Sequence, residues 1–248
     1  MTVLRLSGFL APAIAVIGGL IPPAMAADRE IAALTPDIAQ KSCSGFDPVA
    51  RYGDQIRFEI RRGDLPVGQH VVTFNQGRDG VQVVAESRID ISFLGLNVYQ
   101  FRYRSESIWQ GDDMMSLLVT VDDDGDQTRL NARRKAGKLV VENADGTETL
   151  PGDIFPTDHW HCGVLGSTQV LNTITGRAND VTITRIGTDP LPTPNGPLST
   201  AHYAYRGQLE TNAWYDDAGR WAGLRFVARD GSEITYRCLT CTPTKDPQ

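Results

Sequence analysis

The chain has 248 residues, 41% of them hydrophobic and 22% charged, and its net charge at pH 7 is −6. This length suits one large domain with a substantial hydrophobic core. An acidic chain is a poor candidate for binding nucleic acid or anionic lipid surfaces, so we expect neither as a partner.

The first 26 residues have the features of a secretory signal peptide. Arg5 gives a positive start, residues 9–21 form an apolar run too short for a membrane-spanning helix, and an Ala-Met-Ala cleavage sequence ends at residue 26. We expect a periplasmic or secreted mature protein whose net charge, without Arg5, is −7. The rest of the chain has no run of 18 apolar residues, so no transmembrane segment is expected in the mature protein.

We expect the mature chain to consist of an N-terminal segment (27–53), a single β domain (54–241) and a short tail (242–248). Residues 27–50 hold the one plausible helical patch, which is ended by proline and glycine. The N-terminal segment is therefore expected to be helical or irregular.

From residue 54 onward, apolar and polar side chains alternate with a period of two. Ile56, Phe58 and Ile60 alternate with polar residues, and residues 89–93 and 99–103 repeat the pattern. Such alternation is typical of antiparallel strands with one buried face and one solvated face. Short acidic and glycine-containing sequences suited to hairpin turns separate the runs at residues 78–80, 122–126, 144–146, 216–219 and 230–232.

These patterns predict an all-β fold in which a single antiparallel meander forms a barrel or a strongly curved sheet. The longest loop is expected at residues 189–200, because its prolines cannot join a hydrogen-bonded ladder. The acidic run at residues 122–126 lacks the spacing of a calcium-binding EF-hand loop, so we interpret it as a solvated hairpin turn.

Four cysteines remain after cleavage, and in an oxidising compartment an even number favours disulfides. The candidates are Cys43, Cys162, Cys238 and Cys241. Because a barrel closed by its first and last strands brings their ends together, we expect Cys43 to pair with Cys238 or Cys241. Cys162 would then bond the remaining cysteine, or stay free if Cys238 and Cys241 bond each other. We expect no redox role for the CxxC sequence that ends at Cys241, because no helix follows it.

The sequence FPTDHWHCG at residues 155–163 places two histidines and a cysteine close together. In an extended segment His159 and His161 would point to one side, and Trp160 and Cys162 to the other. Two histidines on one face can chelate zinc or copper, but the further ligands would have to come from elsewhere. The residues considered for this role are Asp158, His70 and His202. Because a lone H-x-H has low specificity, we expect exposed polar residues here and no bound metal.

No motif of a known catalytic or cofactor-binding site occurs in the chain. The nucleophile elbow G-x-S-x-G, the zincin motif H-E-x-x-H, the phosphate-binding loop and the dinucleotide fingerprint are all absent. The sequence therefore identifies no catalytic residue, and we expect no cofactor.

Aromatic residues are the other candidates for a functional site. Tyr99, Phe101 and Tyr103 share one parity, so they would project from the same face of a strand. Most such residues form core, but some could wall a pocket for an apolar ligand, as in small ligand-holding barrels. The residues that we expect to contact such a ligand are Tyr99, Phe101, Tyr103, Phe155, Trp160 and Trp214.

Five stretches of the chain are distinctive in combination, although each alone is typical of a strand or hairpin. They are GDLPVGQHVVTF (63–74), VYQFRYRSESIW (98–109), LNTITG (171–176), AHYAYRG (201–207) and WYDDAGRWAGLRF (214–226). Together they resemble an uncharacterised family of exported bacterial proteins that carries only a domain-of-unknown-function label, over about residues 54–237. The resemblance implies a single curved antiparallel β domain outside the cytoplasm, and it supplies no reaction and no catalytic residues.

Members of that family look similar around residues 155–161, where an aromatic residue is followed by Trp and Asn. Here Phe155 and Trp160 match this pattern, His161 stands at the Asn position, and Cys162 is peculiar to this chain. The resemblance thus implies that Phe155 and Trp160 matter more than the two histidines.

Three functions are compatible with these patterns. Export, a β fold, aromatic residues and the absence of catalytic motifs favour a non-enzymatic protein that binds or carries a lipid or another apolar small molecule. The first alternative is a hydrolase or isomerase with a site near Asp158, His159 and His161, in which a histidine acts as general base. The second alternative is a structural envelope protein with no small ligand.

Overall fold

The computed structural model describes residues 43–242. The chain divides into two units, Met1–Leu34 and Thr35–Gln248, and all described residues belong to the second. The expected signal peptide (1–26), and most of the expected N-terminal segment and tail, lie outside the described residues. No helix within residues 43–242 is long and apolar enough to cross a membrane.

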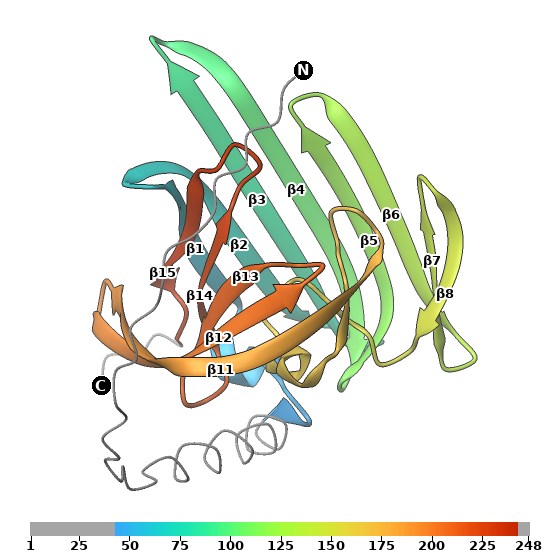
Figure 1. The fold of residues 1–248 in the computed structure, drawn as a ribbon. Coiled ribbons are helices and arrows are strands. Elements are labelled where there is room, and N and C mark those ends of the chain that lie inside the picture. The colour runs from blue at the N-terminus through green and yellow to red at the C-terminus, as the bar shows by residue number, and fades with distance from the viewer. Residues whose placement is uncertain (1–42, 243–248) are drawn as a thin grey trace, which may run out of the picture. The chain divides into compact units, whose positions relative to one another are not determined.

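Within residues 43–242, fifteen strands form one sheet (Figure 1). The strands are β1 (Gln55–Arg62), β2 (Leu65–Gln76), β3 (Val81–Phe93), β4 (Leu96–Gln110), β5 (Asp113–Asp123), β6 (Asp126–Lys135), β7 (Lys138–Asn143), β8 (Gly146–Pro151), β9 (Phe155–Pro156), β10 (Gln169–Leu171), β11 (Ala178–Thr193), β12 (Gly196–Gly207), β13 (Thr211–Tyr215), β14 (Trp221–Val227) and β15 (Glu233–Thr240). Short helical segments lie at α3 (Pro48–Tyr52) and at the 3-10 helix η1 (Cys162–Gly166).

Alternation of apolar and polar residues puts one face of each strand into the core. In β1, Ile56, Phe58 and Ile60 are fully buried, whereas the residues between them are exposed or half-buried. The acidic run at residues 122–126 forms the tight turn between β5 and β6, where the Asp122 carboxylate accepts a hydrogen bond from the amide of Gly125. The predicted all-β class is therefore confirmed.

The strands follow one another across the sheet in the order β8-β7-β6-β5-β4-β3-β2-β1-β15-β14-β13-β12-β11-β10-β9. Neighbouring strands are antiparallel, except that β9 and β10 are parallel. The first and last strands pair, with Phe58 of β1 opposite Cys238 of β15, so two meanders join side by side. Figure 1 shows β11 to β13 running at a steep angle to the long strands β3 to β6, which makes the sheet strongly curled.

The two edges of this sheet are β8 and β9, which follow each other directly in the sequence. Within the described residues no strand pairing joins them, but side chains connect two turns near these edges. Asn143 Nδ2 donates a 2.7 Å hydrogen bond to the carbonyl of Gly176, and Arg177 forms an ion pair with Asp145. The sheet is therefore curled but not closed, so of the two predicted architectures the curved sheet is correct.

The predicted long loop at residues 189–200 is wrong, because this region forms the hairpin of β11 and β12. Its prolines are accommodated because the hairpin extends beyond its neighbours. β10 pairs only with residues 178–180 of β11, and β13 pairs only with residues 201–205 of β12. Pro190 and Pro197 lie beyond these pairings, so their nitrogens can face an open edge without breaking a ladder.

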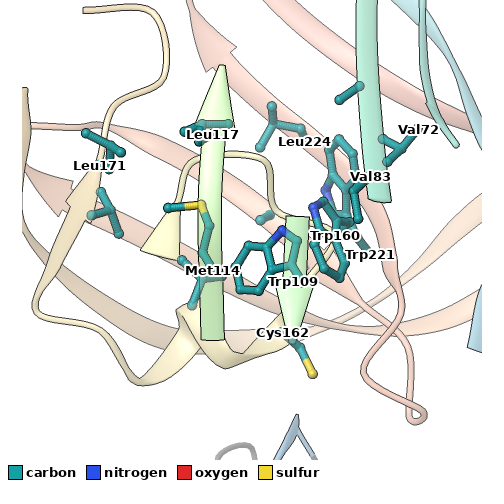
Figure 2. Packing of buried hydrophobic residues seen from close by; sticks show 14 of the residues in the cluster. Val72, Val83, Trp109, Met114, Leu117, Trp160, Cys162, Leu171, Trp221 and Leu224 are labelled. Atoms are coloured by element: carbon teal, nitrogen blue, oxygen red, sulfur yellow. The ribbon is translucent and has the colours of Figure 1, made fainter. Parts of the chain in front are cut away.

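The segment between β9 and β10 lies inside the curl of the sheet. Residues 158–162 are all buried and contact strands of both meanders. Trp160 is 1% exposed, and its ring packs edge-on against Trp109 of β4 at a ring-centroid distance of 5.1 Å (Figure 2). It also packs edge-on against Phe74 of β2, at a ring-centroid distance of 5.5 Å. On the other side, the hydroxyl of Tyr215 in β13 donates a 2.9 Å hydrogen bond to the carbonyl of His159. This segment fills the space between the two halves of the sheet.

Replacing Trp160 with alanine should lower the free energy of unfolding by about 3–5 kcal/mol, because the change removes a fully buried indole and leaves a cavity. The control is Phe155→Ala, because Phe155 is only half-buried against Trp109. This substitution should lower the free energy of unfolding by less. Denaturant unfolding of both variants measures the difference. An equal or smaller loss for Trp160→Ala would show that Trp160 is not the centre of this cluster.

Two disulfides are present among the described residues, Cys43–Cys162 and Cys238–Cys241. The predicted pairing of Cys43 with Cys238 or Cys241 is therefore wrong, although the strand pairing on which it rested, β1 with β15, is present. The reason is that the chain before β1 does not continue along β15. It turns at α3 and packs on the segment inside the curl.

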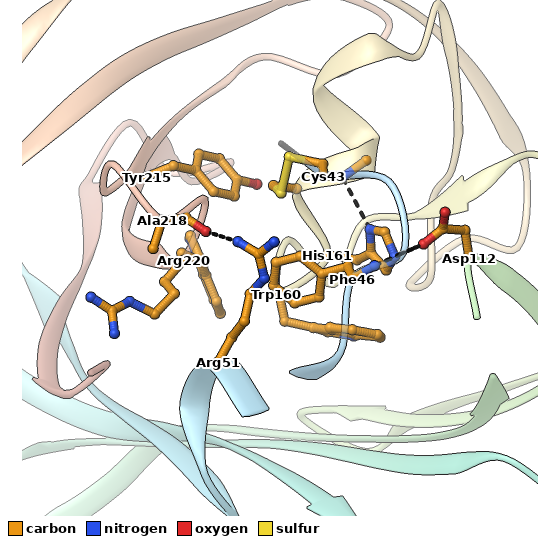
Figure 3. Close-up of a disulfide and its surroundings, with 12 residues drawn as sticks. Cys43, Phe46, Arg51, Asp112, Trp160, His161, Tyr215, Ala218 and Arg220 are labelled. Atoms are coloured by element: carbon orange, nitrogen blue, oxygen red, sulfur yellow. Dashed lines mark hydrogen bonds and ion pairs between the residues drawn. A yellow bond between two sulfur atoms is a disulfide. The ribbon is translucent and has the colours of Figure 1, made fainter. Parts of the chain in front are cut away.

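Aromatic side chains hold this N-terminal part beside Cys162 (Figure 3). The Phe46 ring lies 6.2 Å from the Trp160 ring, and the hydroxyl of Tyr52 donates a 2.7 Å hydrogen bond to the carbonyl of Trp160. These contacts place Cys43 and Cys162 with their Cα atoms 5.5 Å apart, which is within the usual range for a disulfide.

Candidate functional site

A cavity of about 300 Å³ opens on the inner face of the sheet. Strands β2, β3 and β4 form one wall, and β14 and β15 form another. Loop residues 157–159, 172–174 and 209–210, with Thr211 at the start of β13, complete the cavity. Most of the wall is apolar. The principal apolar side chains are Phe101, Trp221, Leu224, Phe226, Val227 and Tyr236.

Asp158 gives this cavity a buried carboxylate, which is 6% exposed. Its Oδ1 accepts a 2.8 Å hydrogen bond from the hydroxyl of Tyr103, which also lies 3.0 Å from Thr173 Oγ1. Its Oδ2 has no hydrogen-bond partner among residues 43–242. Burial raises the pKa of Asp158 to about 6, and the hydroxyls of Tyr103 and Ser105 oppose part of this rise. The carboxyl group is therefore mostly ionised at neutral pH.

His70 of β2 lies on the buried face of its strand, where the alternation otherwise places apolar residues. Its Nδ1 is 2.7 Å from the hydroxyl of Ser87, directly opposite on β3, and its Nε2 has no partner in the described part of the chain. The ring lies 5.5 Å from Trp221 and 5.3 Å from Tyr236. Burial, together with the nearby His159, lowers the pKa of His70 to about 3, so the ring is neutral at pH 7.

His159 has a φ of 60°, a left-handed conformation that is uncommon for residues other than glycine. The hydrogen bond from Tyr215 to its carbonyl holds this turn in place. Its ring lies 5.5 Å from Tyr205 and 5.6 Å from Trp221, and its Nδ1 lacks a partner within residues 43–242. Burial lowers the pKa of His159 to about 4, so this ring is also neutral at pH 7.

Three polar atoms without partners among the described residues thus belong to side chains that line one cavity. They are Oδ2 of Asp158, Nε2 of His70 and Nδ1 of His159. Buried polar atoms in proteins are nearly always hydrogen-bonded, so such a group requires an explanation. An apolar wall with a few converging polar groups has the chemical character of a small-molecule site.

His161 lies in a different environment from His159. Its ring packs against Phe155 and Trp109, with ring centroids 4.9 and 5.4 Å away. Its Nδ1 accepts a 3.0 Å hydrogen bond from the amide of Gly163, so the ring proton is on Nε2, which faces Asp112 Oδ1 at 3.3 Å (Figure 3). Burial lowers the pKa of His161 to about 4, although the Asp112 carboxylate acts in the opposite direction.

The expectation of two exposed histidines on one face is therefore wrong. His159 and His161 are 6% and 4% exposed, and the left-handed turn at His159 means that the segment is not extended. No group of three or more His, Cys, Asp or Glu side chains in residues 43–242 is arranged to hold a metal ion. His202 on β12 stacks on Trp214 instead, and its Nδ1 is 2.8 Å from Asp189.

Of the six aromatic residues predicted to contact a ligand, two line the cavity, namely Phe101 and Tyr103. Tyr99, two residues before Phe101 in β4, hydrogen-bonds to Asp123, and Trp214 hydrogen-bonds to Asp189. Phe155 and Trp160 pack in the aromatic cluster around Trp109. The structure therefore does not bring the six residues together around one space.

Sequence reasoning missed His70 and Trp221 as residues of the cavity. His70 carried a detectable signal, because it is a titratable residue at the buried parity of β2, between the apolar positions of that strand. Trp221 carried none, since its position in β14 is that of an ordinary core aromatic.

The fold and the cavity define a β-barrel-like protein, in which a curled open sheet has a small, mostly apolar cavity on its inner face. Among solved structures it is similar to a beta-barrel-like protein of domain of unknown function DUF1849 from Brucella abortus. That similarity has a TM-score of 0.52 and 16% sequence identity, and covers 76% of this chain and 96% of that one. A DUF1089 family protein from Pseudomonas aeruginosa matches with a TM-score of 0.30 and 15% identity, over 61% and 86% of the two chains.

A family model described as a domain of unknown function, DUF6134, matches residues 58–239. The chain belongs to this family, which confirms the predicted resemblance to an uncharacterised all-β family. No curated protein sequence matches the chain.

Proposed function

We propose that the protein binds a compact, mostly apolar small molecule in the cavity beside Asp158. The observation that carries this proposal is a mostly apolar cavity whose lining residues include three with a buried polar atom that has no partner among residues 43–242. A ligand would contact these residues with a polar group and the aromatic wall with its apolar part.

The size of the cavity restricts the class of ligand. Its volume of about 300 Å³ lies at the lower end of the range of ligand pockets, roughly 300–1,000 Å³. This favours a compact molecule, or part of one chain of a lipid, over a lipid with two full acyl chains. The proposed ligand is therefore restricted to the smaller members of the class that the sequence suggests, a lipid or another apolar small molecule.

We also propose that the protein acts outside the cytoplasm, as the apolar run near its N-terminus predicts. The two disulfides support this location, because they form and persist in oxidising compartments.

Binding of N-phenyl-1-naphthylamine, a fluorescent probe whose nitrogen is uncharged at neutral pH, tests the proposed function. The wild type should bind it saturably, and Ile174→Trp should weaken binding about tenfold or more by filling the cavity beside that position. The matched control is Ile186→Trp on β11, because Ile174 and Ile186 are 48% and 54% exposed and only Ile174 lines the cavity. Equal affinities of the two variants would contradict binding in this cavity.

The predicted hydrolase or isomerase remains a second candidate in a changed form. Asp158 and His159 of the predicted site line the cavity, whereas the His161 ring packs in the aromatic cluster. Asp158 alone has the properties of a general base, with a pKa of about 6 and an unpartnered oxygen among the described residues. Conversion of a bound compound by the wild type, lost in Asp158→Asn, would favour this candidate.

A further inference from the structure

The charges around the cavity have one sign. Two carboxylates line it, Asp158 in its buried part and Glu210 at an exposed position. None of the described residues that line it is lysine or arginine, although the chain has 24 of these residues. Since His70 and His159 are neutral at pH 7, the only charged groups among the described residues that line the cavity are the two carboxylates.

The buried Asp158 carboxylate has no cationic partner among residues 43–242. Oδ1 accepts a hydrogen bond from the neutral hydroxyl of Tyr103, and the hydroxyl of Ser105 also lowers the pKa of this carboxylate. No arginine, lysine or protonated histidine compensates the charge. An unpaired buried charge is costly, and a charged partner brought by a ligand would offset that cost. A carboxylate or phosphate group on the ligand would instead be repelled.

The other walls of the cavity suit the same kind of ligand group. The aromatic rings of Phe101, Trp221 and Tyr236 line it, and aromatic faces attract cations that lie against them. A primary ammonium group donates three hydrogen bonds, and a neutral imidazole nitrogen without its proton can accept one. His70 and His159 also line the cavity, and each has a ring nitrogen without a partner among the described residues that can accept such a hydrogen bond.

Resting on the proposed function, we propose that the ligand is a cationic amine, whose ammonium group pairs with Asp158 and whose compact apolar body fills the aromatic part of the cavity. This assigns Asp158 as the residue that selects the ligand by charge. It also distinguishes the cavity from a fatty-acid site, in which the polar group would be an anion.

Calorimetric titration with three ligands of similar apolar body tests the proposal: 2-phenylethylamine, 2-phenylethanol and 3-phenylpropanoate at pH 7.5. The amine should bind the wild type about tenfold more tightly than the alcohol, and the acid should bind most weakly. Asp158→Asn should abolish the advantage of the amine over the alcohol. The control Glu210→Gln should retain most of that advantage, because Glu210 is exposed.

A pH series on the wild type tests the same point without a substitution. The titratable groups that face Asp158 in the cavity are Tyr103, His70, His159, Tyr236 and Glu210. The advantage of the amine over the alcohol should fall severalfold between pH 7.5 and 5.5, as the Asp158 carboxylate takes up a proton. If this advantage falls by the same factor in Glu210→Gln, the group that takes up the proton is Asp158 and not Glu210.

The amine proposal is overturned if the alcohol binds as tightly as the amine, or if Asp158→Asn keeps the difference between them. It is also overturned if none of the three ligands binds while the neutral naphthylamine probe still binds and Ile174→Trp still weakens that binding. In that last case the proposed function stands and the assignment of a cationic ligand fails. Absence of binding by all four compounds contradicts both.

Discussion

Lowering the pH from 7 to 4.5 should reduce the free energy of unfolding by about 5 kcal/mol, because three histidines are buried in their neutral form. Burial lowers the pKa of His70 to about 3 and that of His159 and His161 to about 4. In the unfolded chain these groups bind protons below about pH 6.5, while in the folded chain they do not. Stability should therefore fall as the pH drops from 6.5 towards 4.

Asp158 acts in the opposite direction over part of this range. Its folded pKa of about 6 is higher than that of a free aspartate, so the folded state binds this proton first and gains stability as the pH falls below 6. This gain from one carboxyl group offsets only part of the stability lost through the three histidines, so the free energy of unfolding still decreases as the pH falls.

Urea unfolding at a series of pH values measures this dependence. In His161→Gln the slope between pH 6 and 4.5 should be smaller by about 1.2 kcal/mol per pH unit, because one group no longer titrates. A stability that is constant or rises from pH 7 to 4.5 would mean that the histidines are not buried as neutral rings.

Removing the Cys43–Cys162 disulfide should lower the free energy of unfolding by about 5 kcal/mol, because the bond closes a long loop in the unfolded chain. The two cysteines are 119 residues apart, and the entropy lost on closing a loop grows with its length. The double variant Cys43→Ala/Cys162→Ala should unfold at a correspondingly lower urea concentration.

The second disulfide is the matched control. Cys238 and Cys241 are also buried but are only 3 residues apart, so their replacement by alanine should cost about 1.5 kcal/mol. Equal losses for the two double variants would contradict this account. Peptide mapping without reduction should identify Cys43–Cys162 and Cys238–Cys241 as the pairs.

The fold was largely predictable because the period of two is a local property of each strand. Ile56, Phe58 and Ile60 identify the buried face of β1 without any knowledge of its neighbours. The positions at which a strand tolerates proline were not predictable from such a local pattern. Pro190 and Pro197 are tolerated because β10 and β13 are shorter than the hairpin of β11 and β12, which is a property of the assembled sheet.

The cavity was less predictable than the fold, because it forms where the two meanders face each other across the curl. Asp158 and His159 attracted attention through the H-x-H sequence, but His70 lies 88 positions before Asp158 in the sequence. The disulfide prediction was wrong because it considered only the pairing of the first and last strands and not the path of this segment. Its path inside the sheet, fixed by Trp160 and Tyr52, brings Cys162 to Cys43.

Native mass spectrometry of the protein purified without detergent from cells that express it naturally tests the central claim most directly. We expect the wild type to carry one small molecule per chain, and we expect this added mass to be lost in Ile174→Trp and retained in Ile186→Trp. A wild-type protein that has only the mass of its polypeptide would contradict ligand binding and favour a structural role. An added mass that Ile174→Trp retains would contradict binding in the cavity beside Asp158.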